Sequence, residues 1–203
     1  MESIKDLIYY AKQLKKEGLV SDGVNKGSIS FRNDNNEIAI SPSKLSYDEL
    51  NENNTNIIDV DGKEISMPSP MSRDTYFHLQ IYKAREDVNA IIHTHSKYAL
   101  ALALANKDIP FIIYGMKQHC KGKVDIAPFY FPNTPECNDA IIKHLEDRNA
   151  VLLQNHGLVC VGKTLKDCYE TVVFVESLAE SYIHAMQIGN VKDIDKWKEV
   201  NYG

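Results

Sequence analysis

The sequence lacks the features that mark several large classes of protein. No apolar run approaches the roughly 18 residues of a membrane span, and the first residues show no basic segment followed by an apolar one, so we expect neither a membrane protein nor a signal peptide. The four cysteines form no C-x-x-C pair, which favours free thiols in a reducing cytoplasm. Basic residues are not in excess: 23 Lys and Arg against 28 Asp and Glu give a net charge of −5, which disfavours a nucleic-acid-binding protein.

What is present is the composition of a folded globular chain. Of 203 residues, 43% are hydrophobic and 25% charged, which is ordinary for a globular protein. No internal repeat, low-complexity tract or Pro/Gly/Ser linker divides the sequence, so we expect one domain over residues 1–203.

The apolar periodicity and turn signals predict interleaved helices and strands. Helices are expected over residues 3–18, 46–49, 72–84, 96–105, 134–146 and 164–189. Strands are expected over residues 28–32, 37–40, 57–60, 88–95, 111–114, 124–127, 150–155 and 158–161. Because several strands are linked as hairpins, we predict an α/β fold: a single three-layer α/β/α domain with a mixed, largely antiparallel central sheet.

The sharpest local feature is a pair of histidines at the end of an apolar strand. Residues two apart on a strand face the same side, so His93 and His95 place two imidazoles side by side. His156 follows another apolar strand in the same way, and Asp74 is a further candidate ligand, with His78 one helical turn later. Catalytic zinc commonly takes three protein ligands and keeps one open position. The alternative is that each histidine is a hydrogen-bonded structural residue, since short motifs also occur by chance.

Several motifs follow one another in an order that resembles the class II aldolase and adducin family. They are Gly27-Ser28-Ile29-Ser30, Ser41-Pro42-Ser43, Arg73-Asp74 with His78, His93-Thr94-His95, Tyr114, His156-Gly157 and Val161-Gly162-Lys163-Thr164. The resemblance implies that His93, His95 and His156 bind one Zn²⁺ per subunit. It further implies that Asp74 serves as metal ligand, catalytic acid/base or both. Tyr114 and Tyr202 are the implied catalytic tyrosines, with Tyr202 reaching a neighbouring active site.

The sequence departs from the family pattern at the loops that bind the substrate phosphate. The matching positions are Gly27, Ser28, Ser43, Lys44, Ser72 and Arg73. Hydroxyls and backbone amides can still hold a phosphate there, and Lys44 or Arg73 would add charge-assisted hydrogen bonds; the alternative for both cations is a solvated surface position. The Asp74-Thr75 pair resembles the epimerase branch of the family, whereas Tyr114 and the Asn155-His156-Gly157 segment resemble the aldolase branch.

The activity implied by the resemblance is zinc-dependent cleavage of a ketose phosphate into dihydroxyacetone phosphate and an aldehyde. The alternatives are 4-epimerisation of a pentulose 5-phosphate, dehydration or decarboxylation of another sugar phosphate, and a non-catalytic scaffold like the head domain of adducin. The implied assembly is a cytoplasmic homotetramer whose partner is a phosphorylated sugar, with no nucleic acid and no membrane.

Overall fold

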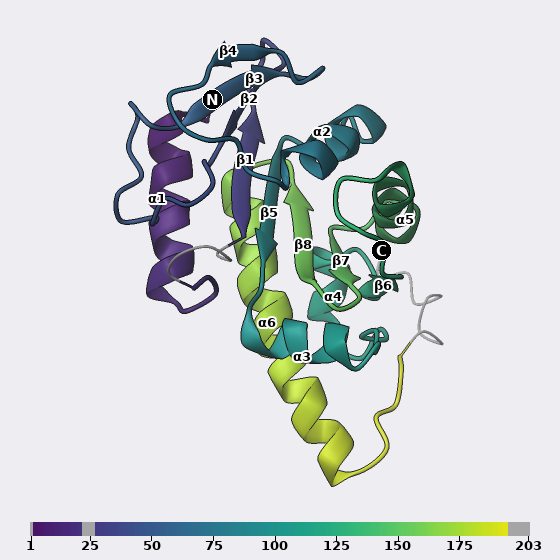
Figure 1. The fold of residues 1–203 in the computed structure, drawn as a ribbon. Coiled ribbons are helices and arrows are strands. Elements are labelled where there is room, and N and C mark those ends of the chain that lie inside the picture. The colour runs from purple at the N-terminus through teal and green to yellow at the C-terminus, as the bar shows by residue number, and fades with distance from the viewer. Residues whose placement is uncertain (1, 22–26, 195–203) are drawn as a thin grey trace, which may run out of the picture.

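Among the described residues, a mixed sheet of eight strands forms the centre of the fold (Figure 1). The computed structural model describes residues 2–21 and 27–194. Across the sheet the strands lie in the order β4-β3-β2-β1-β5-β8-β7-β6, and every neighbouring pair is antiparallel except β6 and β7. The strands are β1 (Ser28–Arg32), β2 (Glu37–Ile40), β3 (Asn56–Asp59), β4 (Glu64–Ser66), β5 (Ala90–Thr94), β6 (Asp125–Ala127), β7 (Ala150–Leu153) and β8 (Gly157–Gly162).

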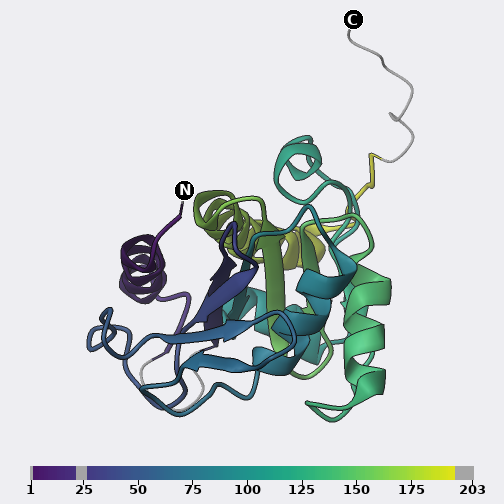
Figure 2. The ribbon, with the colours of Figure 1, turned by 90° about the horizontal axis from the view of Figure 1, so that it is seen from above.

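Helices cover both faces of the sheet, which confirms the predicted three-layer α/β/α domain (Figure 2). The helices are α1 (Ile4–Lys16), α2 (Thr75–Ala84), α3 (Lys97–Leu104), α4 (Gly115–His119), α5 (Pro135–Leu145) and α6 (Leu165–Ile188). One face packs against α1 and α6, and the opposite face packs against α2 and α5. Within the residues described, no helix combines the length and the apolar character that a bilayer crossing needs.

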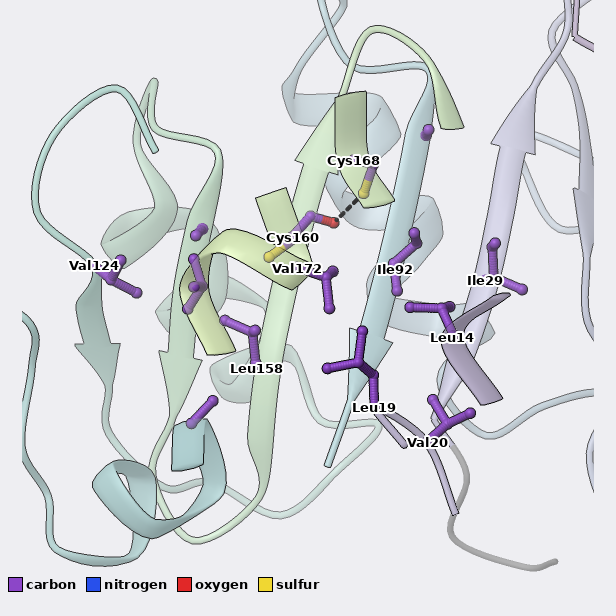
Figure 3. Packing of buried hydrophobic residues seen from close by; sticks show 14 of the residues in the cluster. Leu14, Leu19, Val20, Ile29, Ile92, Val124, Leu158, Cys160, Cys168 and Val172 are labelled. Carbon is purple, nitrogen blue, oxygen red and sulfur yellow. Dashed lines mark hydrogen bonds between the residues drawn. The ribbon is translucent and has the colours of Figure 1, made fainter. Parts of the chain in front are cut away.

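The core between the sheet and helices α1 and α6 contains three of the four cysteines. Successive side chains of a strand point to opposite faces of the sheet, so residues two apart share a face. The side chains on this face include Ile29 of β1, Ile92 of β5, and Leu158 and Cys160 of β8 (Figure 3). The Cys168 thiol of α6 donates to the carbonyl oxygen of Cys160 at 3.1 Å. Burial raises the pKa of both thiols well above its usual value, and all four cysteines are free. Cys160 is therefore a core residue.

Two predicted elements are wrong. The apolar residues at 111–114 form a bend and not a strand, because Ile109 takes the available pairing with Val124 and the chain turns directly into α4. The capping-box sequence at 46–49 forms a turn and not a helix. There the Ser46 hydroxyl accepts from the ammonium group of Lys15 at 3.3 Å, so the hydroxyl is tied to α1.

Candidate active site

The three histidines predicted to bind a metal meet at one end of the sheet. One ring nitrogen from each of His93, His95 and His156 lies within 4.8 Å of the others. The ring centroid of His93 lies 4.6 Å from that of His95 and 4.6 Å from that of His156. The centroids of the His95 and His156 rings are 5.2 Å apart. Residues more than 60 positions apart in the chain are thus brought together as the sequence predicted.

The position and proton of His93 are fixed by the strands on either side. His93 pairs with Ser28 of β1 and Val159 of β8, and its ring is fully buried on the face covered by α2. The Nδ1 atom lies 2.9 Å from the carbonyl oxygen of Leu158, and a carbonyl can only accept, so Nδ1–H is the donor. The neutral ring then carries a lone pair on Nε2, which lies 3.0 Å from His95 Nε2. This outer hydrogen bond is the usual way in which a protein orients a metal-binding imidazole.

His156 is placed by the tight turn between β7 and β8. Asn155 adopts a left-handed backbone (φ 58°), which asparagine tolerates better than most residues, and its N–H donates to Ala103 O at 3.2 Å. A Cβ on Gly157 would lie 2.4 Å from Thr94 O and 2.8 Å from the His95 ring. The sequence Asn155-His156-Gly157 is therefore what allows the turn to approach β5 closely enough for the three rings to meet.

A carboxylate that the sequence analysis missed holds the segment after His95. Glu176 of α6 accepts the N–H groups of Tyr98 (2.8 Å) and Ala99 (3.0 Å) and the hydroxyl of Ser96 (2.7 Å). A carboxylate that accepts the free N–H groups at a helix start stabilises that start, so Glu176 fixes α3 directly beyond His95. No local motif reveals this contact, because Glu176 lies 80 residues after Ser96.

Asp74 lies beside the histidines but is not a member of the compact group of nitrogens. It precedes α2 and is partly buried. Burial raises its pKa, but His93, His78, a hydrogen bond from Ser28 and His156 together bring the pKa below its usual value. Asp74 is therefore ionised at neutral pH and close enough to His93 to interact with it electrostatically.

Ser28 needs a correction, because its hydroxyl does not lie in an open phosphate site. The side chain is fully buried. Its Oγ is 2.9 Å from His78 Nε2, and the hydroxyl is close enough to Asp74 to help lower the pKa of that carboxyl group. His78 does not belong to the metal-ligand group: it is fully buried between α2 and β1, and burial lowers its pKa to about 4, so its ring is neutral. Both side chains are buried near Asp74 instead of facing solvent.

The three loops predicted to bind phosphate lie next to one another beside Asp74. Ser41 Oγ accepts the N–H of Ile29 at 3.1 Å, which ties the loop at 41–44 to the start of β1. The N–H of Ser43 donates to Pro70 O at 3.0 Å, which ties the same loop to the segment at 70–73. Segments far apart in sequence thus converge where the resemblance placed a phosphate.

Within these loops the individual residues have different surroundings. A Cβ on Gly27 (φ 88°) would lie 2.1 Å from His93 O, so only glycine fits between this loop and β5. Ser72 is buried, and its Oγ accepts the N–H of Asp74 at 3.3 Å. Ser43 is partly exposed, and Lys44 and Arg73 are exposed. The structure thus leaves both cations accessible to an anionic group.

Of the two predicted catalytic tyrosines, Tyr114 is not brought to the histidines of the same chain. Tyr114 stands before α4, which packs against α6 on the opposite face of the sheet from the His93 ring, and the tyrosine is 70% exposed. Tyr202 lies outside the described residues.

The donor set fits a divalent cation. Burial lowers the pKa of His93 to about 3, and burial followed by His95 lowers the pKa of His156, so both rings are neutral and able to ligate. Three imidazoles with Asp74 nearby, and no cysteine among them, match the donor set of a catalytic zinc site more closely than that of a closed structural one. The residues present therefore suit a metal that keeps a position open for a substrate.

Comparison with known proteins agrees with this geometry. Residues 5–183 match the family model described as Class II Aldolase and Adducin N-terminal domain. The chain is 32% identical over 189 residues (93% of this chain, 87% of the relative) to 5-deoxy-D-ribulose 1-phosphate aldolase of Bacillus thuringiensis serovar kurstaki. It is 33% identical over 169 residues (82% and 76%) to 5-methylthioribulose-1-phosphate/5-deoxyribulose-1-phosphate aldolase of Rhodospirillum rubrum. A solved L-fuculose 1-phosphate aldolase superposes with a TM-score of 0.89 at 30% identity, covering 97% of this chain and 94% of that one.

Proposed function

The chain belongs to the class II aldolase and adducin family and is an aldehyde-lyase, and from this premise we propose that it cleaves a ketose 1-phosphate into dihydroxyacetone phosphate and an aldehyde. The names of the three similar proteins share a ketose with phosphate on its first carbon. Retro-aldol cleavage of such a compound gives dihydroxyacetone phosphate in each case, and only the aldehyde differs. The motifs favour L-fuculose 1-phosphate, while the two sequence relatives favour 5-deoxyribulose and 5-methylthioribulose 1-phosphates.

The observation that carries the proposal is the convergence of three imidazoles beside an ionised carboxylate. His93, His95 and His156 would hold one Zn²⁺, which supplies a positive charge that polarises the substrate carbonyl and stabilises the negative charge developing next to it.

The protein's own groups then handle the protons. As the carbon–carbon bond breaks, the hydroxyl that becomes the aldehyde oxygen loses a proton, and the carbon left with the electron pair gains one. Asp74, ionised and next to His93, is suited to carry a proton between these positions. Its separation from the compact nitrogen group favours this role over that of a fourth ligand.

The remaining predicted residues bind and orient the substrate. The phosphate would be held where the three loops meet. The residues proposed to bind it are Gly27, Ser43, Lys44, Ser72 and Arg73. The two cations, Lys44 and Arg73, would add charge-assisted hydrogen bonds. Binding at the phosphate orients the reacting carbons, which lie elsewhere in the substrate.

Tyr114 would act from a neighbouring subunit. Its exposure and its place on the other face of the sheet fit a residue that completes the site of another copy, where its hydroxyl would hydrogen-bond the aldehyde oxygen. Tyr202 is proposed for the same neighbouring site on the resemblance alone. This arrangement requires a homo-oligomer, proposed here as a cytoplasmic tetramer.

Two other functions are separated from this one by direct assays. A 4-epimerase acting on a pentulose 5-phosphate is favoured by the Asp74-Thr75 pair and would keep both fragments bound, so it would release no aldehyde. A non-catalytic scaffold would purify with almost no metal even after zinc supplementation.

The proposed function is tested by incubating the purified protein with the three named ketose 1-phosphates and measuring dihydroxyacetone phosphate and free aldehyde. We expect both products in equal amounts from at least one compound. Interconversion of pentulose 5-phosphates without free aldehyde would replace the aldolase proposal with the epimerase.

A further inference from the structure

An apolar groove lies along the second half of α6, a part of the helix that projects beyond the sheet (Figure 1). Its volume is about 350 Å³. One wall is a stripe of α6 at the spacing of a single helix face, and the other wall comes from the segments at 112–113 and 191. The side chains that give the groove its apolar character are Ile112, Phe174, Leu178, Tyr182, Ala185 and Val191. None of the described residues that line the groove carries a charge.

Large apolar side chains are also exposed around this groove. Ile113 lines the groove and is half exposed, its neighbour Tyr114 is exposed, and Ile188 near the end of α6 is 89% exposed. Apolar groups that gather on one surface mark an interaction site, whereas single ones do not. The centre of a protein interface is poor in charged residues, as this groove is. The surface around α6 therefore has the composition of an interface.

A second uncharged surface is the loop between β6 and α5, residues 128–133, called here the aromatic loop. Phe129 and Phe131 form a T-shaped pair with ring centroids 5.6 Å apart, and Phe131 is 74% exposed. Both ends of the loop are held. The N–H of Phe129 donates to Gln154 Oε1 at 2.9 Å, and the Thr134 hydroxyl donates to Phe131 O at 2.8 Å. Exposed aromatic side chains on a fixed backbone are suited to anchor a partner, because little freedom is lost on binding.

We propose that the aromatic loop of one copy of this chain fills the apolar groove of a second copy. Among the described residues, no part of the loop lines the groove of its own chain. A cavity of about 150 Å³ is enough for a benzene ring, so a groove of about 350 Å³ can take an aromatic side chain. Because groove and loop are different surfaces of one chain, the contact is head-to-tail, and it forms a ring when the rotation closes.

The same contact would place Tyr114 of one copy beside the histidines of the other. Tyr114 follows Ile113 at the groove, and the aromatic loop is bonded to Gln154, two residues before His156. The contact thus supplies a tyrosine that the structure does not bring to the histidines of its own chain. This agreement favours a second copy over a different partner. The catalytic role of Tyr114 rests on the proposed function, whereas the contact between copies does not.

Cross-linking between copies tests the contact directly. The protein carries Cys137→Ser, because Cys137 is the one cysteine that is not fully buried. Phe131→Cys on the loop is combined with Ser177→Cys in the groove, and the zinc-replete protein is treated with a short bismaleimide. We expect covalent dimers and larger species on a denaturing gel. In the control, Phe131→Cys with Ser66→Cys on the exposed strand β4 should stay at 23.0 kDa.

Charges placed in the groove test whether assembly depends on it. Ser177 and Ser181 line the groove and are exposed, so changing both to Glu adds two carboxylates without altering the core. Burying unpaired charges is costly, so we expect light scattering to give single chains of 23.0 kDa. Circular dichroism checks that the variant is folded. Ser66→Glu is the matched control and should keep the mass of the wild-type oligomer. With no neighbour to supply Tyr114, kcat of the doubly charged variant should fall about tenfold or more at unchanged zinc content.

Three results would overturn the proposal. They are a wild-type protein that is a single chain, an oligomer without a cross-link between the cysteines at 131 and 177, and a doubly charged variant that assembles like wild type. A cross-linked oligomer that cleaves no ketose phosphate would refute the proposed function and leave the contact standing. A wild-type single chain that cleaves the substrate would refute the contact and leave the proposed cleavage standing.

Discussion

At the scale of single residues, Gly157 sets how closely two strands approach at the metal site. Because a Cβ would meet Thr94 O at 2.4 Å, Gly157→Ala forces the turn that carries His156 away from β5. We expect a loss of about 1–3 kcal/mol in the free energy of unfolding, the usual cost of overpacking, together with weaker zinc binding. Urea titration and zinc calorimetry measure the two effects.

Gly189→Ala is the matched control for this substitution. Its Cβ would meet nothing within 4 Å, and its φ of 173° is extended backbone that any residue adopts. Equal unfolding free energies and zinc affinities for the two variants would contradict the assigned role of Gly157.

The buried ring of His78 predicts a pH dependence of stability. Its pKa is about 4 in the folded protein, against about 6.5 in the unfolded chain, so the unfolded state takes up the proton first as pH falls. This contribution to stability is present above pH 6.5 and is lost as the pH falls towards 4. Between pH 7 and 5, we expect metal-free wild type to lose about 2 kcal/mol more unfolding free energy than His78→Gln. Equal losses in urea titrations at the two pH values would show that His78 is protonated in the folded protein.

At the scale of elements, the start of α3 depends on a distant carboxylate. Glu176 accepts two backbone N–H groups and one hydroxyl there. Glu176→Ala should lower the free energy of unfolding by about 2–3 kcal/mol, because hydrogen bonds to a charged group are lost. It should also weaken zinc binding, since His95 precedes this helix directly.

Glu170→Ala on the same helix provides the comparison. Glu170 forms an exposed pair with Lys166, and such pairs contribute about 0–1 kcal/mol. If thermal unfolding shows the same change for both variants, Glu176 does not support α3 in the way described.

The elements also show how far sequence reasoning reaches. Most helices and strands, the layering and the pairing of His93 with His95 follow from local periodicity. His156 is a candidate because it follows another apolar strand, and the resemblance implies the same residue. The hydrogen bonds of Ser28 and Glu176 are to partners 50 and 80 residues away, which no local pattern encodes. The strand predicted at 111–114 failed for a similar reason: apolar residues form a strand only where a neighbouring strand has a free edge, and Val124 was paired with Ile109.

At the scale of the whole molecule, the exposed Tyr114 predicts a site shared between subunits. Tyr114→Phe and His93→Ala should each reduce activity strongly when present in every chain. In mixed oligomers of the two variants, a site with intact histidines can receive an intact tyrosine from its neighbour. Random mixing should then restore about a quarter of wild-type activity. Co-expression with two purification tags, followed by an activity assay, measures the recovery. If no activity is recovered, Tyr114 acts in the site of its own chain or takes no part in catalysis.

The proposed cleavage depends on one divalent ion held by three imidazoles. The most direct measurement follows dihydroxyacetone phosphate release from the preferred ketose 1-phosphate by protein that is chelator-treated and then titrated with zinc. We expect no cleavage by the stripped protein. Activity should then rise linearly up to one zinc per chain, and His93→Ala should regain none. Full activity of stripped wild type, or of His93→Ala, would contradict it.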